Sequence, residues 1–403
     1  MTTQRDLKDT CSETPFGGLR RGAGRAVAVA MIGLLAPTAA ATAAAATPPV
    51  AHNQVADVAG ARARTVLPGL AGIIAVRPDG KVFATVSGQT VRQWNIATGR
   101  KAGPPLAVHA GAVNSVAYSP DGKKLAVATA REVALWDAAT GEKSATPLTG
   151  HTGAVRSVAF NPPGTLLVTA GNDRTVRLWN VATGELIYTM RGHDGAVRFV
   201  VFSPDGRTIA STGDGEDNTV RLWRTGLGRP IGEALRVTPG PVYATSFSPD
   251  GELLATSGGG NAVRLWDPAT GEPAGDPLIS SAGPVLALTF SPNGKLLATS
   301  SGGDNTVQLW NTKTREAAAE PLAGHTGPVR AMRFAPGGKR LATGSDDGTV
   351  RLWNTKSGAL QGTPLTGHTG PVWALRISPD GKRLITAGAD SKARLWRLTK
   401  AAA

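Results

Sequence analysis

Eight tryptophans recur along this chain at intervals of 42 to 44 residues. They are Trp94, Trp136, Trp179, Trp223, Trp266, Trp310, Trp353 and Trp396. A period of this length is typical of closed architectures that repeat one small structural unit. The fold must therefore accommodate eight copies of a short module, and residues that recur once per module are first of all structural.

The module is clearest in residues 324–358, which read GHTGPVRAMRFAPGGKRLATGSDDGTVRLWNTKSG. Its hydrophobic pattern predicts strands at residues 329–334, 340–343 and 349–353. A Pro-Gly-Gly turn at residues 336–338 joins the first two strands. Five other modules have Asp-Gly there, where glycine accepts the positive φ of a tight hairpin: Asp79–Gly80, Asp121–Gly122, Asp205–Gly206, Asp250–Gly251 and Asp380–Gly381. The module is therefore a set of antiparallel hairpins.

A fourth strand is predicted between each tryptophan and the next module. Prolines recur in this stretch, and a proline cannot donate to a strand ladder, so the strand is expected at the outer edge of its sheet. These prolines are Pro105, Pro147, Pro277, Pro321 and Pro364. Eight four-stranded antiparallel sheets around one axis make an eight-bladed β-propeller, which is the all-β fold predicted for this chain.

The last module has too few residues after Trp396 for an outer strand. Residues 61–67 (ARARTVL) precede the first module and are expected to supply that strand. The N-terminal segment would then close the ring by completing the last blade. The alternative is a ring of seven blades with one irregular unit.

The composition agrees with a turn-rich β protein, since the chain has 51 glycines, 28 prolines and only 5% aromatic residues. Its single cysteine, Cys11, excludes an intramolecular disulfide and a cysteine metal site. The formal net charge is +14, which suggests affinity for anionic partners without naming one.

Residues 1–46 predict a signal peptide or an N-terminal membrane segment. Arg20 and Arg21 precede an uncharged run whose most apolar part is residues 26–36, and Ala-x-Ala sites follow. This order favours export, with the protein secreted or associated with the cell envelope. A membrane anchor and a cytoplasmic protein with a low-complexity segment are the alternatives. Residues 47–60 are a predicted linker, residues 61–398 the repeat domain and residues 399–403 a tail.

Three motifs recur in phase from about residue 61 to residue 398. They are Gly-His at the start of a module, Asp six residues before the tryptophan, and Trp-Asp or Trp-Asn at the end of the third strand. With these motifs the chain resembles the WD-repeat family of β-propellers. The resemblance implies a hydrogen-bond network of His, Ser or Thr, Asp and Trp within a blade. The matching sets are His151, Thr169, Asp173 and Trp179; His193, Ser211, Asp217 and Trp223; His325, Thr343, Asp347 and Trp353; and His368, Thr386, Asp390 and Trp396.

The other four modules depart from the motif. Leu67 and Gly88 replace His and Asp in the first, the second keeps His109 but has Ala130 for Asp, the fifth has Thr238 and Gly260, and the sixth has Ser281 but keeps Asp304. These blades are expected to be locally less stable, because an indole or backbone N–H there needs another partner.

Five of the six histidines and the motif aspartates stand at equivalent repeat positions, never more than one of each per module, so they are interpreted as structural rather than as catalytic or metal-binding residues. No paired carboxylates and no phosphate-binding glycine loop stand out. The chain is therefore predicted to be no enzyme and to bind no cofactor or metal. Arginine recurs two residues before most of the tryptophans, where its stem is expected to pack over a neighbouring side chain. Arginines spread around a ring do not form the basic stripe of a nucleic-acid binder.

The resemblance also implies a partner-binding face, the top face, reached by the residue after the valine of each first strand. These residues are Asn114, Arg156, Arg198, Tyr243, Leu286, Arg330 and Trp373, with Gly72 in the first module. Their chemical variety predicts a scaffold, active as a monomer, that binds an acidic protein partner. The alternatives are binding of an anionic envelope polymer or membrane surface by net charge, and a propeller hydrolase or lactonase.

Overall fold

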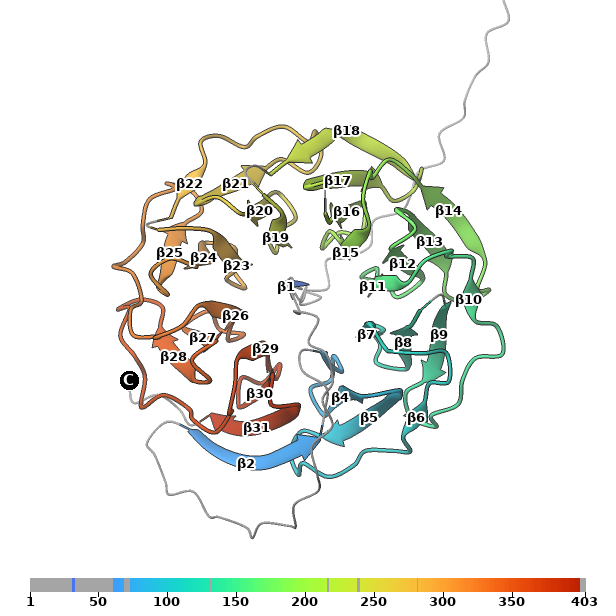
Figure 1. Cartoon of the computed structure of the whole chain (residues 1–403), viewed down its shortest axis with the longest axis horizontal. Coiled ribbons are helices and arrows are strands. Elements are labelled where there is room, and N and C mark those ends of the chain that lie inside the picture. The colour runs from blue at the N-terminus through green and yellow to red at the C-terminus, as the bar shows by residue number, and fades with distance from the viewer. Residues whose placement is uncertain are drawn as a thin grey trace, which may run out of the picture.

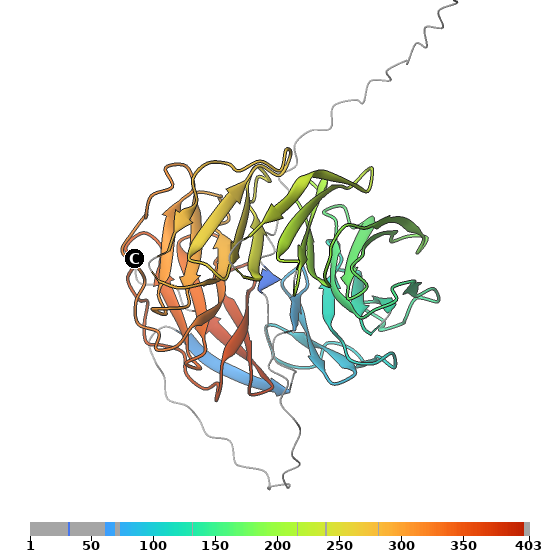
Figure 2. The same ribbon diagram turned by 45° about the horizontal axis from the view of Figure 1, so that its top comes forward.

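The computed structural model describes residues 31–32, 61–68, 73–130, 132–215, 217–237, 240–280 and 282–398. The eight predicted sheets stand side by side around a central axis, each with its first strand innermost (Figure 1). Seen from an oblique angle, the sheets form a closed ring (Figure 2). The structure is thus the predicted eight-bladed β-propeller.

The first four blades follow the chain in order. Blade 1 comprises β3 (Ile74–Val76), β4 (Val82–Ser87), β5 (Thr90–Asn95) and β6 (Leu106–Ala107); blade 2 comprises β7 (Ser115–Tyr118), β8 (Lys124–Ala128), β9 (Glu132–Asp137) and β10 (Leu148–Thr149). Blade 3 comprises β11 (Val155–Phe160), β12 (Leu166–Gly171), β13 (Val176–Asn180) and β14 (Leu186–Met190); blade 4 comprises β15 (Val197–Phe202), β16 (Thr208–Gly213), β17 (Thr219–Arg224) and β18 (Arg229–Arg236).

The second half of the ring repeats this order. Blade 5 comprises β19 (Val242–Phe247), β20 (Leu254–Gly258), β21 (Ala262–Trp266) and β22 (Leu278–Ile279); blade 6 comprises β23 (Val285–Phe290), β24 (Leu296–Ser301) and β25 (Val307–Asn311). Blade 7 comprises β26 (Val329–Phe334), β27 (Arg340–Ser345) and β28 (Val350–Asn354); blade 8 comprises β29 (Val372–Ile377), β30 (Arg383–Gly388), β31 (Lys392–Leu398) and, outermost, β2 (Ala61–Pro68).

In the five blades where a predicted proline precedes it, the outer edge is short, whereas β14, β18 and β2 form longer outer strands in blades 3, 4 and 8. In blades 1, 2 and 5 the outer strand has two residues and directly follows one of these prolines. In blades 6 and 7 the fourth strand is reduced to isolated bridges, such as Val307 to Leu322 and Val350 to Leu365. A proline beside each of these pairings limits the row of unpaired backbone groups that a neighbouring chain could extend.

Strand β2 closes the ring. It pairs antiparallel with β31 from Ala61–Leu398 to Pro68–Lys392, and the two lie together at the rim of the ring (Figure 1). The seam between blades 8 and 1 is packed like the others, since one core cluster joins Phe83 and Trp94 of blade 1 to Leu395 of blade 8. The predicted closure by the N-terminal segment is confirmed.

The apolar core lies between neighbouring blades rather than inside any one of them. One cluster, for example, joins Leu135 of blade 2 to Leu167 and Trp179 of blade 3. The first turns add a second contact between blades. At Gly80, which has φ +69°, a Cβ atom would lie 2.7 Å from Cδ of Pro379 in blade 8, so only glycine fits there.

A two-residue strand, β1 (Met31–Ile32), lies at the middle of the ring and pairs with β19 through Met31–Thr245 and Ile32–Ala244 (Figure 1). Most of the predicted signal segment, the linker and the tail lie outside the described residues, so these assignments stay predictions. None of the described residues belongs to a helix long and apolar enough to cross a membrane.

Candidate interaction surface

Four blades contain the expected networks of His, Ser or Thr, Asp and Trp. In blade 3, His151 Nδ1 lies 2.8 Å from Asp173 Oδ2, and its Nε2 lies 2.7 Å from Thr169 Oγ1. The Trp179 indole N–H donates to the same hydroxyl at 2.9 Å. Because that oxygen accepts from tryptophan, its own proton is available for Nε2, and Nδ1–H then donates to the carboxylate. The chain of hydrogen bonds joins strands β12 and β13 to the turn between them and to the loop that carries His151.

The other three networks repeat this geometry. The His Nε2 to hydroxyl distance is 2.7 Å in blade 4 and 2.8 Å in blades 7 and 8, and the indole to hydroxyl distance is 2.8 to 2.9 Å. The His to Asp contacts are His193–Asp217, His325–Asp347 at 2.8 Å and His368–Asp390 at 3.0 Å.

Burial and hydrogen bonding fix the charges within these networks. Burial opposes ionisation of Asp173, but hydrogen bonds from His151, Thr175 and the Thr152 backbone hold the pKa of its carboxyl well below the usual range. The pKa values of the other three network aspartates are lowered for the same reasons. Burial also lowers the pKa of His325 and His368. The network aspartates are therefore ionised, and His325 and His368 favour the neutral form.

Three of the four modules that depart from the motif keep a partner for their indole, and the lower local stability expected of these blades stays a prediction. Trp94, Trp266 and Trp310 each donate at 2.8 Å to a threonine of the second strand, although no histidine completes the network. Threonine alone satisfies the indole in these blades. Only Trp136 in blade 2 has an indole nitrogen that is buried and finds no partner among the described residues.

The arginine two residues before the tryptophan packs over the glycine of the Gly-His motif. At Gly150 a Cβ atom would lie 2.6 Å from Arg177 Nη1, and at Gly324 a Cβ atom would lie 2.6 Å from Arg351 Nη1. In blade 8, Arg394 also donates to Asp390 at 2.6 Å and is only 5% exposed. These arginines are parts of the blade wall, which agrees with the expected packing of their stems.

On one side of the ring, the loops between blades contact the turns that follow the second strands. For example, Asn172 N donates to Ala154 O at 2.8 Å. We call this side of the ring the top face. Three arginines stand there, each held by a residue of its own blade. Arg156 donates to Asn172 at 2.8 Å, and Arg330 pairs with Asp346 at 2.8 Å. Arg198 lies 3.7 Å from Asp214.

Two of the predicted contact residues do not present a free side chain at this face. Leu286 is 9% exposed, because it packs over Gly302 at the end of its own hairpin. Asn114 bridges blades 2 and 3 by donating to the carbonyl oxygens of Thr129 at 3.2 Å and Val155 at 3.0 Å. Tyr243 and Trp373 are partly exposed, and Gly72 lies outside the described residues.

A second basic feature lies three residues further along two neighbouring inner strands. Arg333 on β26 and Arg376 on β29 are partly buried, and the equivalent positions of the other blades carry Ala, Val, Ser or Thr. Burial, and the charge of Arg376 close by, lower the pKa of Arg333 to about 9, so its guanidinium remains charged at neutral pH. Burial also lowers the pKa of Arg376. The sequence signal for this pair was a charge at a position that is small or apolar in every other module.

Within the described part of the chain, no three His, Cys, Asp or Glu side chains are grouped so that they could hold a metal ion.

Comparisons with known proteins agree with this architecture. The family model described as "IFT122 first beta-propeller" matches residues 112–272, and the model "WD domain, G-beta repeat" matches residues 276–311, 319–354 and 358–397. Among solved structures, the crystal structure of the computationally designed Ika8 protein superposes with a TM-score of 0.71 at 22% identity, covering 82% of this chain and 98% of that chain. At this identity the likeness concerns the fold alone. No curated protein matches the sequence.

Proposed function

This chain belongs to the WD-repeat family of β-propellers, and from that premise we propose that it is a non-enzymatic scaffold whose top face binds an acidic protein partner. WD-repeat propellers are generally protein-interaction scaffolds. The observation that carries the finer proposal is the contrast between two sets of residues. Network residues repeat at equivalent positions in blades 3, 4, 7 and 8, whereas residues at the inner strand ends differ from blade to blade and include Arg156, Arg198, Arg330 and Trp373.

The arginines are suited to recognise carboxylates because their positions are already fixed. Asn172 and Asp346 orient Arg156 and Arg330 before any partner arrives, which lowers the entropy lost on binding. A guanidinium has five N–H donors, and a single carboxylate does not use them all. It can therefore bond a second acidic group at the same time. Arg333 and Arg376 add positive charge to the inner strands of blades 7 and 8, three residues along the strand from Arg330 and Trp373.

The test is affinity capture with three baits: the wild-type protein, an Arg156→Ala/Arg198→Ala/Trp373→Ala variant, and a control. The control, Arg224→Ala/Arg229→Ala/Arg236→Ala, removes exposed arginines from the outer strands of blade 4. We expect the top-face variant to capture at least tenfold less partner than the wild-type protein, and the control to capture as much as the wild type. Equal loss from both variants would contradict a top-face site.

The net charge of +14 supports a second candidate, binding of an anionic polymer or membrane surface. That mode responds to total charge, so it should weaken steeply with salt and stay unchanged in Trp373→Ala. Vesicles of anionic lipid, tested at two salt concentrations with the wild-type protein and this variant, separate the two candidates.

Export remains part of the proposal, and its support is the arrangement of basic, apolar and small residues in positions 1–46. N-terminal sequencing of the native protein tests it directly. A mature chain that begins near residue 47 agrees with export, and an intact Met1 contradicts cleavage.

A further inference from the structure

Blade 2 lacks most of the side chains that fill the space around the tryptophan in other blades. Val127 stands where the indole-binding threonine or serine lies elsewhere, and Ala130 replaces the aspartate. In blade 3 an arginine packs over the glycine of the Gly-His motif. In blade 2 Val108 replaces that glycine and Ala134 replaces the arginine. The blade therefore has a gap where Arg177 lies in blade 3.

The missing threonine leaves one buried donor without a partner. Trp136 is 8% exposed, and its indole nitrogen makes no hydrogen bond to any residue that the structure describes. The other seven repeat tryptophans donate to a threonine or serine at 2.8 to 2.9 Å. An unsatisfied buried donor costs stability unless something else accepts from it.

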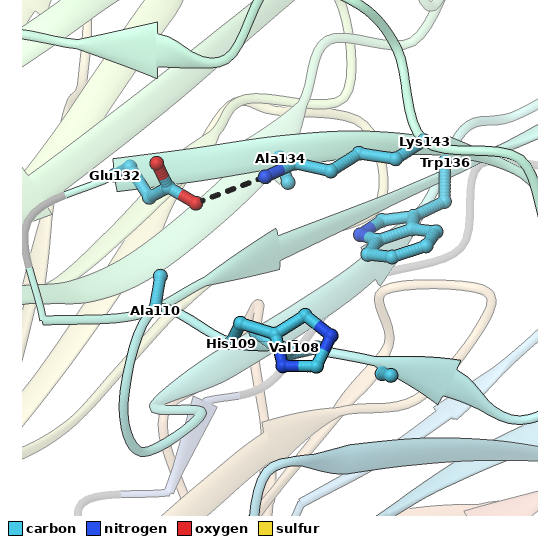
Figure 3. A pocket seen from close by; sticks show the side chains of 8 residues that line it. Val108, His109, Ala110, Glu132, Ala134, Trp136 and Lys143 are labelled. Atoms are coloured by element: carbon cyan, nitrogen blue, oxygen red, sulfur yellow. Dashed lines mark hydrogen bonds and ion pairs between the residues drawn. The ribbon is translucent and has the colours of Figure 1, made fainter.

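A pocket of about 450 Å³ opens beside this indole. Its wall includes Val108, His109, Glu132, Ala134, Trp136 and Lys143, which face one another in Figure 3. Lys143 reaches from beside Trp136 toward Glu132 and pairs with it at 3.2 Å, with the two side chains 41% and 23% exposed. A pocket of this size, with apolar walls and a few polar groups, is in the range of small-molecule sites.

We propose that this pocket binds a small organic carboxylate. The indole N–H and the Lys143 ammonium are donors that cannot accept, so they select a ligand atom that accepts from both. The methyl groups of Ala134 and Val108 suit an apolar body attached to the carboxylate. The ion pair with Glu132 is partly exposed, and the Lys143 ammonium has three N–H donors, so Lys143 can bond the ligand carboxylate while it stays paired with Glu132.

This site is independent of the proposed top-face function. It lies against β9, the third strand of blade 2, and none of its residues belongs to the inner strands that carry Arg156, Arg198 and Trp373.

Benzoate is a suitable probe, observed through the indole signals of full-length protein labelled with ¹⁵N at its nine tryptophans. Trp136→Phe assigns the signal. We expect benzoate to shift the Trp136 signal saturably, benzamide to bind at least tenfold more weakly, and benzylamine, with the opposite charge, not to shift it. No saturable shift with benzoate, or tighter binding of benzylamine, would overturn the proposal.

Two variants test the residues. Val127→Thr gives the indole an internal acceptor, as Thr85 does without a histidine in blade 1, and should weaken benzoate binding at least tenfold while the melting temperature does not fall. Lys143→Gln should weaken binding to a similar extent. Its matched control is Lys101→Gln, because the backbone of Lys101 forms an isolated β-bridge with Trp94 in blade 1, as that of Lys143 does with Trp136. Unchanged affinity in both test variants, or equal loss in the control, would refute the assignment.

Discussion

At the scale of single residues, one hydroxyl per blade decides whether the tryptophan is satisfied. In blades 1, 5 and 6 a threonine accepts from the indole without a histidine, and in blades 3, 4, 7 and 8 the hydroxyl of a threonine, or of Ser211 in blade 4, also bonds a histidine. The hydroxyl is therefore the contact that these seven blades share, whereas the histidine completes it in four. The histidine and aspartate continue this chain of hydrogen bonds to the loop.

A substitution in blade 7 removes the hydroxyl that blade 2 lacks. Thr343→Val keeps the shape of the side chain but leaves the Trp353 indole and His325 without their shared partner. We expect the free energy of unfolding to fall by about 1–3 kcal/mol, the usual cost of an unsatisfied buried group. Urea unfolding measures it, and Thr363→Val on the exposed surface is the control. A cost no larger than that of the control would contradict the role of the hydroxyl.

Acid should destabilise the protein in two steps. The folded pKa values of His325 and His368 are lowered, so their stabilising contribution is complete above the unfolded value of about 6.5 and is lost as the pH falls toward the folded values. The network aspartates, also lowered, lose theirs below an unfolded value of about 3.9. Unfolding free energies measured from pH 7.5 to 3 should decline gently and then steeply.

The double variant His325→Gln/His368→Gln separates the two steps. It removes the titrating imidazoles, so the decline between pH 7 and 5 should flatten while the loss at lower pH remains. A profile that keeps the wild-type slope in both ranges would show that other groups control the pH dependence.

At the scale of the elements, β2 is the strand on which ring closure depends. Its removal exposes the edge of β31 along the whole ladder from Lys392 to Leu398, and an unpaired edge invites association between chains. A chain that starts at residue 61 should melt like the full protein, whereas one that starts at residue 69 should melt lower and associate. Thermal melts and light scattering of the two chains test this. Identical behaviour would mean that β2 contributes nothing to closure.

The sequence predicted the elements well because each carries a local signal. Tryptophan and proline spacing gave eight blades, and the first strand of blade 7 runs from Val329 to Phe334 as expected. Side-chain environments were harder, since they depend on the adjacent blade or loop. Asn114 donates to the carbonyl oxygen of Val155 in blade 3, and Leu286 packs over Gly302. No pattern within one strand reveals these contacts.

At the scale of the whole molecule, the ring joins blades of unequal internal bonding. Blades 3, 4, 7 and 8 have complete networks, blades 1, 5 and 6 have only the indole to threonine bond, and blade 2 has neither. Amide hydrogen exchange followed by mass spectrometry should therefore be fastest in the strands of blade 2 and slowest in the complete blades. Uniform protection around the ring would contradict this order.

The pairing of β2 with β31 also orders events during synthesis. Ala61–Pro68 leaves the ribosome before any blade exists, whereas β31 is made only after the strands of blades 1 to 7. Until then β2 has no partner for its backbone groups. The ring therefore closes only after synthesis has passed Leu398, and a chain interrupted before Lys392 cannot complete its last blade.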